Sequence, residues 1–575
     1  MQTRDQTVAV VRLVVIVACA LLLVAAAAAS PTAVVAVSET TAAPATPAAG
    51  ADRGAGAITP RIVGLLPNPV APDDAGEYVH LSLPPGNWSV DDGEDVVTVQ
   101  QQRPGPVLVT ADPEAPLDPP GGRVVADGLA LSNAGERVVL RRGGANGTVV
   151  DAVEYGRAPE GERWARDGAP EWRPVGFDPR DTVPLGAANA TAFVLPDAPA
   201  EPVAAVRGAD ERVLLAGYTF ASQRVTDELV AAHERGVSVR VLLDGAPVGG
   251  VSAEQAARLD ALVDAGVEVR VIAGPHARFR YHHAKYAVAD DAAVVLTENW
   301  KPSGTGGGDS RGWGVTLQSS RAADALADLF RGDAGWRDAV RWERYRDDRT
   351  FERADAATGS YPTRHPPADV RIERVRLMTA PGNAESAVVA IVDDAGDRVD
   401  VLQPTVDDGP MLASLRRAAE RGVRVRLLLS GAWYVAEENA AIVAELNRWA
   451  DAAGVPFEAR VADPAGRYGK VHAKGVVADD VALVGSLNWN PTSARENREV
   501  VVALEGEAAA GYYRESFTAD WRAGRGATSL TDGLPPSVSI TAVGAVAAAA
   551  LFVKRRLTIG GTDENQRGDR DGPVG

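Results

Sequence analysis

Two copies of one short pattern, His-x-Lys-x-x-x-x-Asp, stand far apart in the chain and combine residue types that can act on a phosphate group. Lysine is otherwise rare here, because arginine serves as the general basic residue. The lysine ammonium is a compact point charge that can contact a phosphoryl oxygen, whereas arginine offers a wide planar fork. A lysine two residues after the histidine in both copies therefore predicts that an ammonium is needed there. The residues of the two copies are His283, Lys285 and Asp290, and His472, Lys474 and Asp479.

Further polar residues follow each copy in the same register, namely Thr297 and Asn299 after the first and Ser486 and Asn488 after the second. Residues i and i+2 of a strand project from one face, so the His and Lys of each copy point the same way. If the copies face each other, the lysines and these polar groups could bind a phosphoryl group and stabilise its developing charge. One imidazole could attack phosphorus while the other protonates the leaving oxygen and then activates water. The lysine pair would repel a metal ion.

Each motif closes a similar series of elements, in residues 203–350 and in residues 370–522. Helices that end at a glycine and lead into apolar strands indicate a parallel sheet covered by helices. We therefore predict an α/β fold in which two halves pair about a pseudo-twofold axis. The predicted strands are 213–218, 237–243, 267–272, 399–403, 423–429 and 457–461, and the predicted helices are 225–235, 253–265, 411–420 and 437–452.

The duplicated pattern resembles the signature of the phospholipase D superfamily, over roughly residues 203–522. The resemblance implies a covalent phosphohistidine intermediate, no metal or other cofactor, and hydrolysis or transfer of a phosphodiester. It also implies roles for the motif residues. The two histidines would be the nucleophile and the acid/base, the lysines and Asn299 and Asn488 would bind phosphate, and the two aspartates would be mainly structural supports.

In that family an acidic residue further along often orients each histidine. Glu499 takes this place in the second copy, and Asp309 is a looser candidate in the first. The copies also differ at the phosphate loop. The family pattern Gly-Ser-x-Asn is intact from Gly485, whereas the first copy reads Leu-Thr-Glu-Asn from Leu296. We expect Leu296 to crowd the phosphate and Glu298 to repel it, so the first half would be slower or differently specific.

Residues 59–195 show short alternating apolar runs separated by Gly, Pro, Asn and Asp, a pattern that predicts an all-β sandwich. Segments such as 66–70 (Leu-Pro-Asn-Pro-Val) and 150–156 (Val-Asp-Ala-Val-Glu-Tyr-Gly) resemble the lamin-tail domain, an immunoglobulin-like module. The resemblance implies binding or positioning, and the region contains no catalytic constellation.

Both ends of the chain carry long apolar runs. Residues 1–29 read as a signal peptide and 30–58 as an Ala/Thr/Pro-rich stalk. Residues 536–553 would form a transmembrane helix, and the basic residues that open 554–575 predict a cytoplasmic tail. These segments predict a single-pass protein of the cell membrane with its catalytic body outside the cell and a membrane contact through the C-terminal helix.

The 575-residue chain has a formal net charge of −18, with scarce lysine and abundant Asp, Ala, Val and Gly, as in proteins of salt-loving prokaryotes. In molar salt the Debye length is only about 3 Å, so this charge does not exclude an anionic partner. Two functions remain open. The first is a metal-independent phosphodiesterase acting on phospholipid or nucleic acid, for which two halves suffice as a monomer. The alternative is a cell-surface binding or adhesion protein with a degenerate enzyme body.

Overall fold

The computed structural model describes most of the chain between Ile58 and Ala523. The described residues are 58–113, 122–126, 129–166, 171–177, 179–274, 277–354 and 357–523. The predicted signal peptide (1–29), the stalk up to residue 57, the transmembrane segment (536–553) and the tail (554–575) lie outside these residues.

The first described part, from Arg61 to Pro174, is an all-β unit of two sheets. Its core is shared between the sheets, since Leu81 and Val109 of one pack in the same cluster as Trp88 and Val99 of the other. The all-β region predicted from the alternating runs is therefore present, while its likeness to the lamin-tail domain stays a prediction. The strands, in sheet order, are β10 (Glu171–Pro174), β9 (Glu162–Ala165), β1 (Arg61–Leu66), β2 (Tyr78–Leu83), β5 (Gly105–Thr110) and β6 (Arg123–Ala126), then β4 (Val96–Gln101), β3 (Gly86–Asp91), β7 (Glu136–Arg142) and β8 (Thr148–Tyr155).

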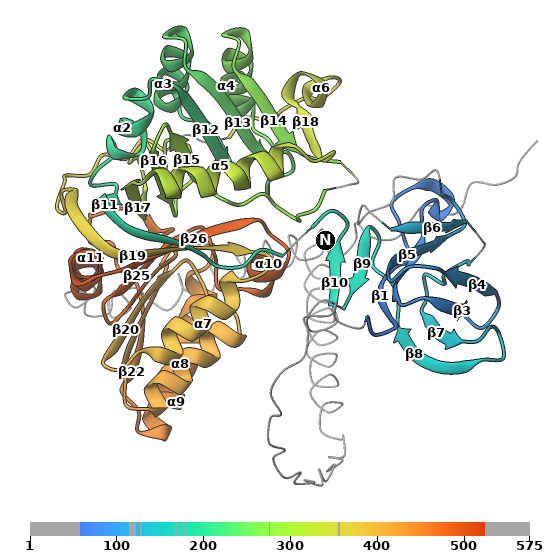
Figure 1. Cartoon of the computed structure of the whole chain (residues 1–575). Helices are drawn as coiled ribbons and strands as arrows, with labels where there is room; N and C mark the ends of the chain where they lie inside the picture. Colours follow the sequence, from blue (N-terminus) through green and yellow to red (C-terminus); the bar gives the residue numbers. More distant parts are fainter. Residues whose placement is uncertain are drawn as a thin grey trace, which may run out of the picture. The chain divides into compact units, whose positions relative to one another are not determined.

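The rest of the described chain is built on one 16-stranded sheet that reads the same way outward from its centre (Figure 1). The two central strands, β11 (Val183–Leu195) and β19 (Ala368–Ala380), are antiparallel neighbours. Outward from β11 lie β17 (Ser310–Gln318), β16 (Ala292–Leu296), β15 (Tyr286–Ala289), β12 (Arg212–Gly217), β13 (Ser238–Asp244), β14 (Glu268–Ile272) and β18 (Ala339–Arg341). Outward from β19 lie β26 (Glu499–Glu505), β25 (Val481–Gly485), β24 (Gly475–Ala478), β20 (Arg398–Gln403), β21 (Arg424–Leu429) and β22 (Phe457–Val461).

This mirrored order confirms the two α/β repeats, with two differences from the prediction. Strands β12, β13 and β14 are parallel, as expected, but β15, the first strand of the hairpin that follows the motif, pairs antiparallel with β12. In addition, β11 falls inside the range 59–195 that the sequence assigns to the N-terminal sandwich, yet it pairs with β17 and β19. Alternating apolar residues mark a strand without saying which sheet it joins, because the pairing partner is distant in sequence.

Helices cover the sheet because each has one apolar face. Near one end of the sheet, α2 (Glu201–Arg207), α3 (Gln223–Glu234) and α4 (Ala253–Asp264) pack on β12–β14. At the other end, α7 (Ala384–Asp394), α8 (Pro410–Glu420) and α9 (Ala436–Ala453) pack on β20–β22. Two further helices, α5 (Ser320–Ala334) and α11 (Glu507–Ala523), share a central apolar core with strands of both halves. The smaller elements are α6 (Trp342–Arg346), α10 (Pro491–Arg495), η1 (Pro72–Asp74) and β23 (Lys470–Val471).

Reciprocal contacts join the halves at the two motifs. The amide of His283 donates to the carbonyl of Arg498 at 2.9 Å, and the amide of His472 donates to the carbonyl of Arg311 at 3.0 Å. Each motif segment is thus held by the strand of the opposite half. The same two arginines form buried ion pairs across the halves, Arg311 with Asp520 of α11 and Arg498 with Asp333 of α5, both at 2.9 Å.

Each motif aspartate lies in the turn of the hairpin that follows its histidine and holds that turn to the start of a neighbouring strand. Asp290 and Asp479 stand at the hairpin turns with φ near +50°, the left-handed region that Asp tolerates better than most residues. The Asp479 carboxylate accepts N–H bonds from Gly396, Asp397 and Arg398 at the start of β20, at 2.7–3.1 Å. Asp290 accepts the equivalent three bonds at the start of β12. Both residues therefore act as structural supports.

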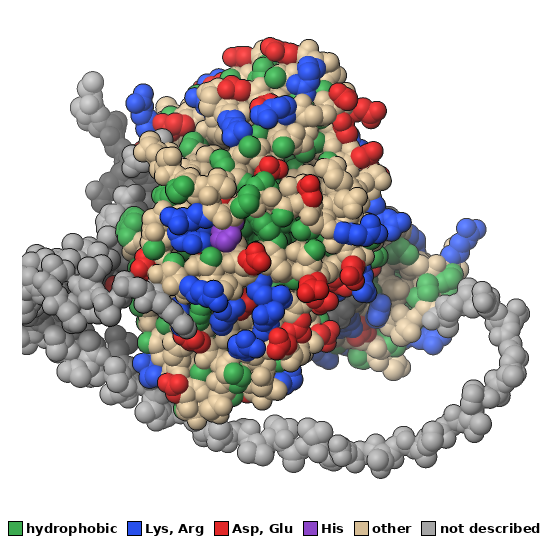
Figure 2. Space-filling model, turned by 90° about the vertical axis from the view of Figure 1, so that its left-hand side faces the viewer, with side chains coloured by type: hydrophobic (Ala, Val, Ile, Leu, Met, Phe, Trp, Pro, Cys, Tyr) green, Lys and Arg blue, Asp and Glu red, His purple; other side chains and the backbone are tan. Residues whose placement is uncertain are grey.

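Acidic and basic side chains are interspersed on the face of the molecule drawn in Figure 2. Among the described residues, some acidic and basic side chains pair across neighbouring strands, as Arg240 does with Glu268 at 2.9 Å. Such partly exposed pairs each contribute little to stability.

The predicted location in the cell membrane requires correction. No helix among the described residues is long and apolar enough to cross a bilayer. The apolar runs that suggested a membrane anchor lie in the segments outside those residues, where an apolar composition alone carried the prediction.

The support role of Asp479 makes a stability prediction. Burial opposes ionisation, but the three backbone N–H bonds outweigh it and hold the pKa of this carboxyl below its ordinary value. Asp479→Asn should lower the free energy of unfolding at pH 7 by about 1–2 kcal/mol, because one charged acceptor is lost. Because the Asp479 carboxyl has a lowered pKa in the folded protein, its ionised form stabilises the fold at pH values above the ordinary pKa. This stabilisation is lost on acidification, so the stability difference between the wild type and the variant should shrink as the pH falls below about 4.

Denaturant unfolding of the two forms at pH 7 and pH 3.5 would measure this effect. Asp480→Asn is the matched control, because Asp480 is exposed and, within the described part of the chain, accepts a hydrogen bond through its backbone carbonyl, from Gly506, and not through its side chain. Equal stability losses in the two variants would contradict the assigned role.

Candidate active site

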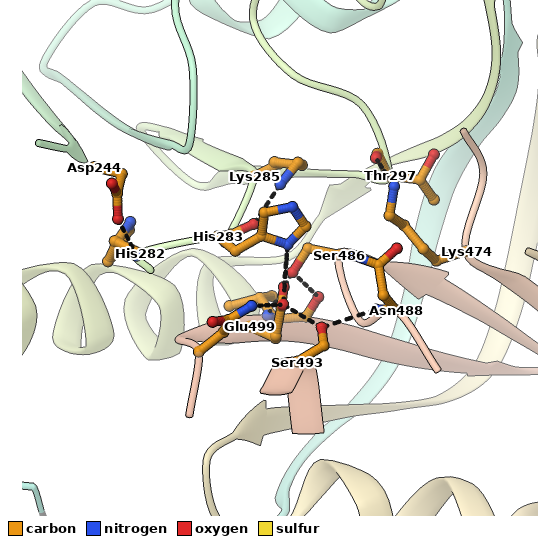
Figure 3. Close-up of polar contacts among 12 residues, drawn as sticks. Asp244, His282, His283, Lys285, Thr297, Lys474, Ser486, Asn488, Ser493 and Glu499 are labelled. Carbon is orange, nitrogen blue, oxygen red and sulfur yellow. Dashed lines mark hydrogen bonds and ion pairs between the residues drawn. The ribbon is translucent and has the colours of Figure 1, made fainter. Parts of the chain in front are cut away.

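Where the two halves meet, His283 pairs with Glu499 (Figure 3). His283 Nδ1 lies 2.9 Å from both carboxylate oxygens of Glu499, which begins β26 in the other half. Glu499 also accepts from the Ser493 hydroxyl and, at 3.2 Å, from Asn497 Nδ2. A carboxylate on Nδ1 fixes the tautomer with hydrogen there and leaves Nε2 free to react.

This pairing corrects the sequence expectation for Glu499. The sequence assigned Glu499 to the histidine of its own half, but its partner is the histidine of the first half. The reason is that the residues just before β26 form hydrogen bonds with the segment that carries His283. Proximity in sequence could not reveal this contact between the halves.

The second histidine has a different acidic partner from the one expected. His472 Nδ1 lies 3.1 Å from Glu298 Oε2, in the loop after β16. Asp309, the looser candidate from the sequence, instead pairs with Lys470 at 3.2 Å. Glu298, expected only to repel phosphate, therefore faces His472 from the opposite half, as Glu499 faces His283.

The two motif lysines reach the same region and are deeply buried, with 0% exposure for Lys285 and 3% for Lys474. Each ammonium donates to the carbonyl of its own motif histidine, at 2.5 Å and 2.6 Å. Lys474 also reaches the carbonyl of Thr297 in the other half at 3.5 Å. Within the described residues neither lysine forms a salt bridge, so each keeps donor capacity for an anion.

The four predicted phosphate-loop residues divide into two kinds. The hydroxyls of Thr297 and Ser486 accept backbone N–H bonds from Trp313 (2.9 Å) and Val500 (3.0 Å) and so anchor their loops. The amide side chains are less engaged. Asn299 is buried, and its Oδ1 has no hydrogen-bond partner among the described residues, while Asn488 is partly exposed beside Lys474 in Figure 3.

Burial sets the protonation of the site. It lowers the pKa of His283 to about 4 and that of Lys474 to about 8. Burial, reinforced by three lysines, holds the pKa of His472 well below its ordinary value. These shifts all disfavour positive charge on the basic groups of the site, and an anion placed among these groups would reverse them.

The two carboxylates respond to burial in opposite ways. Burial raises the pKa of Glu298 to about 8, although Lys474 and other lysines oppose the rise. Burial also opposes ionisation of Glu499, but the charge and hydrogen bond of His283 outweigh it and lower that pKa. Glu499 is thus the firmly ionised member of the pair.

Sequence reasoning missed several residues that shape the site. The Tyr218 ring packs edge-on at 4.7 Å from the His283 ring and lies 5.3 Å from the Lys285 ammonium. Ser493 and Asn497 hold Glu499 in place. Tyr218 directly follows a parallel strand, a position that often carries functional residues, so a weak signal was available. The contacts of Ser493 and Asn497 with Glu499 depend on the tertiary structure, so the sequence carried no signal for these two residues.

The fold and the site together can be compared with known families. Residues 203–334 and 388–521 match the family model described as "Cardiolipin synthase, PLD-like domain". These two segments form a phospholipase D-like body. They include both motifs and both orienting glutamates, and they correspond to the two halves of the sheet. The resemblance read from the duplicated motif is therefore confirmed.

Solved structures with a similar arrangement are distant. The phosphatidylserine synthase of Haemophilus influenzae is 14% identical, covering 58% of this chain and 86% of its own, with a TM-score of 0.44. Nuc, a phospholipase D family member from Salmonella typhimurium, is 17% identical, covering 28% and 99%, with a TM-score of 0.24. No curated protein sequence matches the chain.

The phospholipase D-like body depends on Glu499 for the orientation of His283, and this can be tested. Glu499→Gln keeps the shape but removes the charge that fixes the imidazole, so we expect kcat on a phosphodiester substrate to fall roughly 10²- to 10⁴-fold. The measurement is steady-state kinetics with the melting temperature as a check on folding. Glu496→Gln is the matched control, since Glu496 forms a half-exposed pair with Arg280. A similar kcat in both variants would contradict the role of Glu499.

Proposed function

We propose that the phospholipase D-like body is a phosphodiesterase that works without a metal through a phosphohistidine intermediate. The observation that carries this proposal is the pair of buried lysines, one from each half, which lack salt bridges among the described residues. Each donates to the carbonyl of its own motif histidine, and each of these histidines faces a carboxylate. A buried ammonium without an anion is costly, and a bound phosphodiester would supply one negative charge between them. The amides of Asn299 and Asn488 would add neutral donors.

In this proposal His283 is the nucleophile. Its neutral imidazole attacks phosphorus through Nε2, a P–N bond forms, and the P–O bond to the leaving group breaks. The intermediate places positive charge on the imidazole, and the ionised Glu499 beside Nδ1 stabilises that charge. Glu298 is held closer to its neutral form, so it would stabilise a phosphoimidazolium on His472 less well.

His472 is then the acid and base. Anionic substrate offsets the lysine charges that lower its pKa, which allows the imidazole to carry a proton. His472 gives this proton to the leaving oxygen and afterwards takes one from an attacking water. The P–N bond breaks, the phosphomonoester leaves, and His283 is restored. The side chain of His472 is 22% exposed and that of His283 is 9% exposed, which suits His472 to receive water.

Trapping the intermediate tests this assignment. His472→Asn should slow release of the intermediate and accumulate substrate-derived phosphate on His283, whereas His283→Asn should accumulate none. Acid-labile, base-stable label on the protein, located by mass spectrometry, is the measurement. Turnover by the wild type and labelling of the His472→Asn variant should both proceed with a chelator present. Label on His472 in the His283→Asn variant would reverse the roles, and loss of all activity with chelator would contradict the metal-free mechanism.

The substrate class is proposed as phospholipid or nucleic acid, and an exposed aromatic pair offers a way to decide. Trp433 is 83% exposed and Tyr434 is 50% exposed, in the loop before α9. The Tyr434 ring lies 5.6 Å from the ammonium of Lys470, two residues before His472. The pair can contact the part of a substrate that does not react, either by stacking on a base or by covering an acyl chain.

We expect Trp433→Ala to raise KM about tenfold on the class that this residue contacts, the size of a stacking contact of about 1.4 kcal/mol. Single-stranded DNA and phospholipid vesicles are the two substrates to compare, with initial rates measured over a range of concentrations. An effect on DNA alone would assign nucleic acid, and an effect on vesicles alone would assign lipid. Unchanged KM on both would contradict a role for this pair.

A further inference from the structure

The carboxylates that face the two histidines stand at positions that are not equivalent in the two halves. In the first half β16 and β17 pair so that Leu296 is opposite Gly314, and in the second half β25 and β26 pair Gly485 with Val501. The next hydrogen bonds agree, because Thr297 donates to the carbonyl of Trp313 and Ser486 donates to that of Val500.

This register makes Gly312 the equivalent of Glu499, and Leu487 the equivalent of Glu298. The strand position that holds a carboxylate in the second half therefore holds a glycine in the first. The loop position that holds a carboxylate in the first half holds a buried leucine in the second, with 3% exposure. Each half therefore has one carboxylate at these two positions, in the loop in the first half and on the strand in the second.

Packing shows that the two positions share one space. A Cβ atom built on Gly312 would lie 2.1 Å from Cγ and 2.7 Å from Oε1 of Glu298, far inside van der Waals contact. The Glu298 side chain thus occupies the volume that a side chain at 312 would enter. It is 1% exposed, and its Oε2 reaches His472 Nδ1 at 3.1 Å.

We infer that Glu298 replaces, from the loop, the carboxylate that the strand position 312 lacks, and that it is the positioning residue for His472. This inference rests on the proposed function for the use of His472 as acid and base. The departure Leu-Thr-Glu-Asn in the first phosphate loop then supplies a carboxylate for His472 and compensates for its absence at position 312. Glycine at 312 is needed because any side chain there would displace Glu298.

The exchange leaves the two histidines unequally supported. Glu499 is fixed by Ser493 and Asn497. Among the described residues, Oε1 of Glu298 has no hydrogen-bond partner and neither does His472 Nδ1, so the 3.1 Å contact of Nδ1 with Oε2 is a close polar contact without hydrogen-bond geometry. A less constrained carboxylate with a raised pKa suits a histidine that must gain and lose a proton in each turnover. The firmly held Glu499 suits a histidine that must keep one orientation.

The test restores the second-half arrangement in the first half of the full chain. Glu298→Ala should lower kcat roughly 10²- to 10⁴-fold, because His472 loses its partner. Gly312→Glu alone should lower the melting temperature, since its side chain collides with Glu298. Glu298→Ala combined with Gly312→Glu should regain at least tenfold in kcat over Glu298→Ala and should also regain the melting temperature. Alanine is chosen at 298 because it removes the Cγ that meets position 312.

Glu298→Ala with Gly312→Gln is the matched control, because it fills the same volume but cannot ionise when His472 takes up a proton, so it should restore stability but not kcat. A readout independent of activity is the ¹⁵N spectrum of the His472 imidazole. Glu298→Ala should change the ratio of the Nδ1–H and Nε2–H tautomers of His472, and the Ala/Glu pair should restore the wild-type ratio. An unchanged tautomer in Glu298→Ala, or equal rescue by Gln and Glu, would overturn the inference. If the tautomer results agree with the inference but the wild-type protein cleaves no phosphodiester, the proposed function alone would be overturned.

Discussion

The reciprocal hydrogen bonds between the halves are the constraint on which the rest of this structure depends. Each motif segment bonds to the strand of the opposite half, through the amides of His283 and His472. The buried pairs of Arg311 with Asp520 and Arg498 with Asp333 secure the same junction. Removing one member of a buried pair leaves an uncompensated charge and is strongly destabilising. Neither half can therefore form its part of the site alone.

This junction explains the electrostatics of the site. The lysines are buried because they sit at the interface between two apolar halves, and burial lowers the pKa of Lys474 and of both histidines. These basic groups thus lie in surroundings that disfavour their charge. Under the proposed function, a phosphate group would offset this imbalance, and the preorganised donors would need no rearrangement to do so. The same geometry aims one histidine from each side.

The halves are related by symmetry but have become chemically distinct. Glu499 stands on a strand and is held by neighbouring donors, whereas Glu298 stands on a loop and fills the space over Gly312. A reaction with a nucleophile and a separate acid/base needs two histidines with different properties. A duplicated fold supplies two similar positions, and small exchanges of side chains between strand and loop make them unequal.

The sequence alone determined the family and much of the local structure. The spacing of His283 and Lys285, repeated at His472, indicated a phospholipase D-like body, and the apolar periodicity located four of the helices and the six parallel strands within a few residues. These features depend on near neighbours in the chain. Only the tertiary structure decided that Glu499 faces His283, that Glu298 faces His472, and that β11 joins the central sheet. Those pairings cross from one half to the other or join distant strands, and no local pattern encodes which strand a residue will meet.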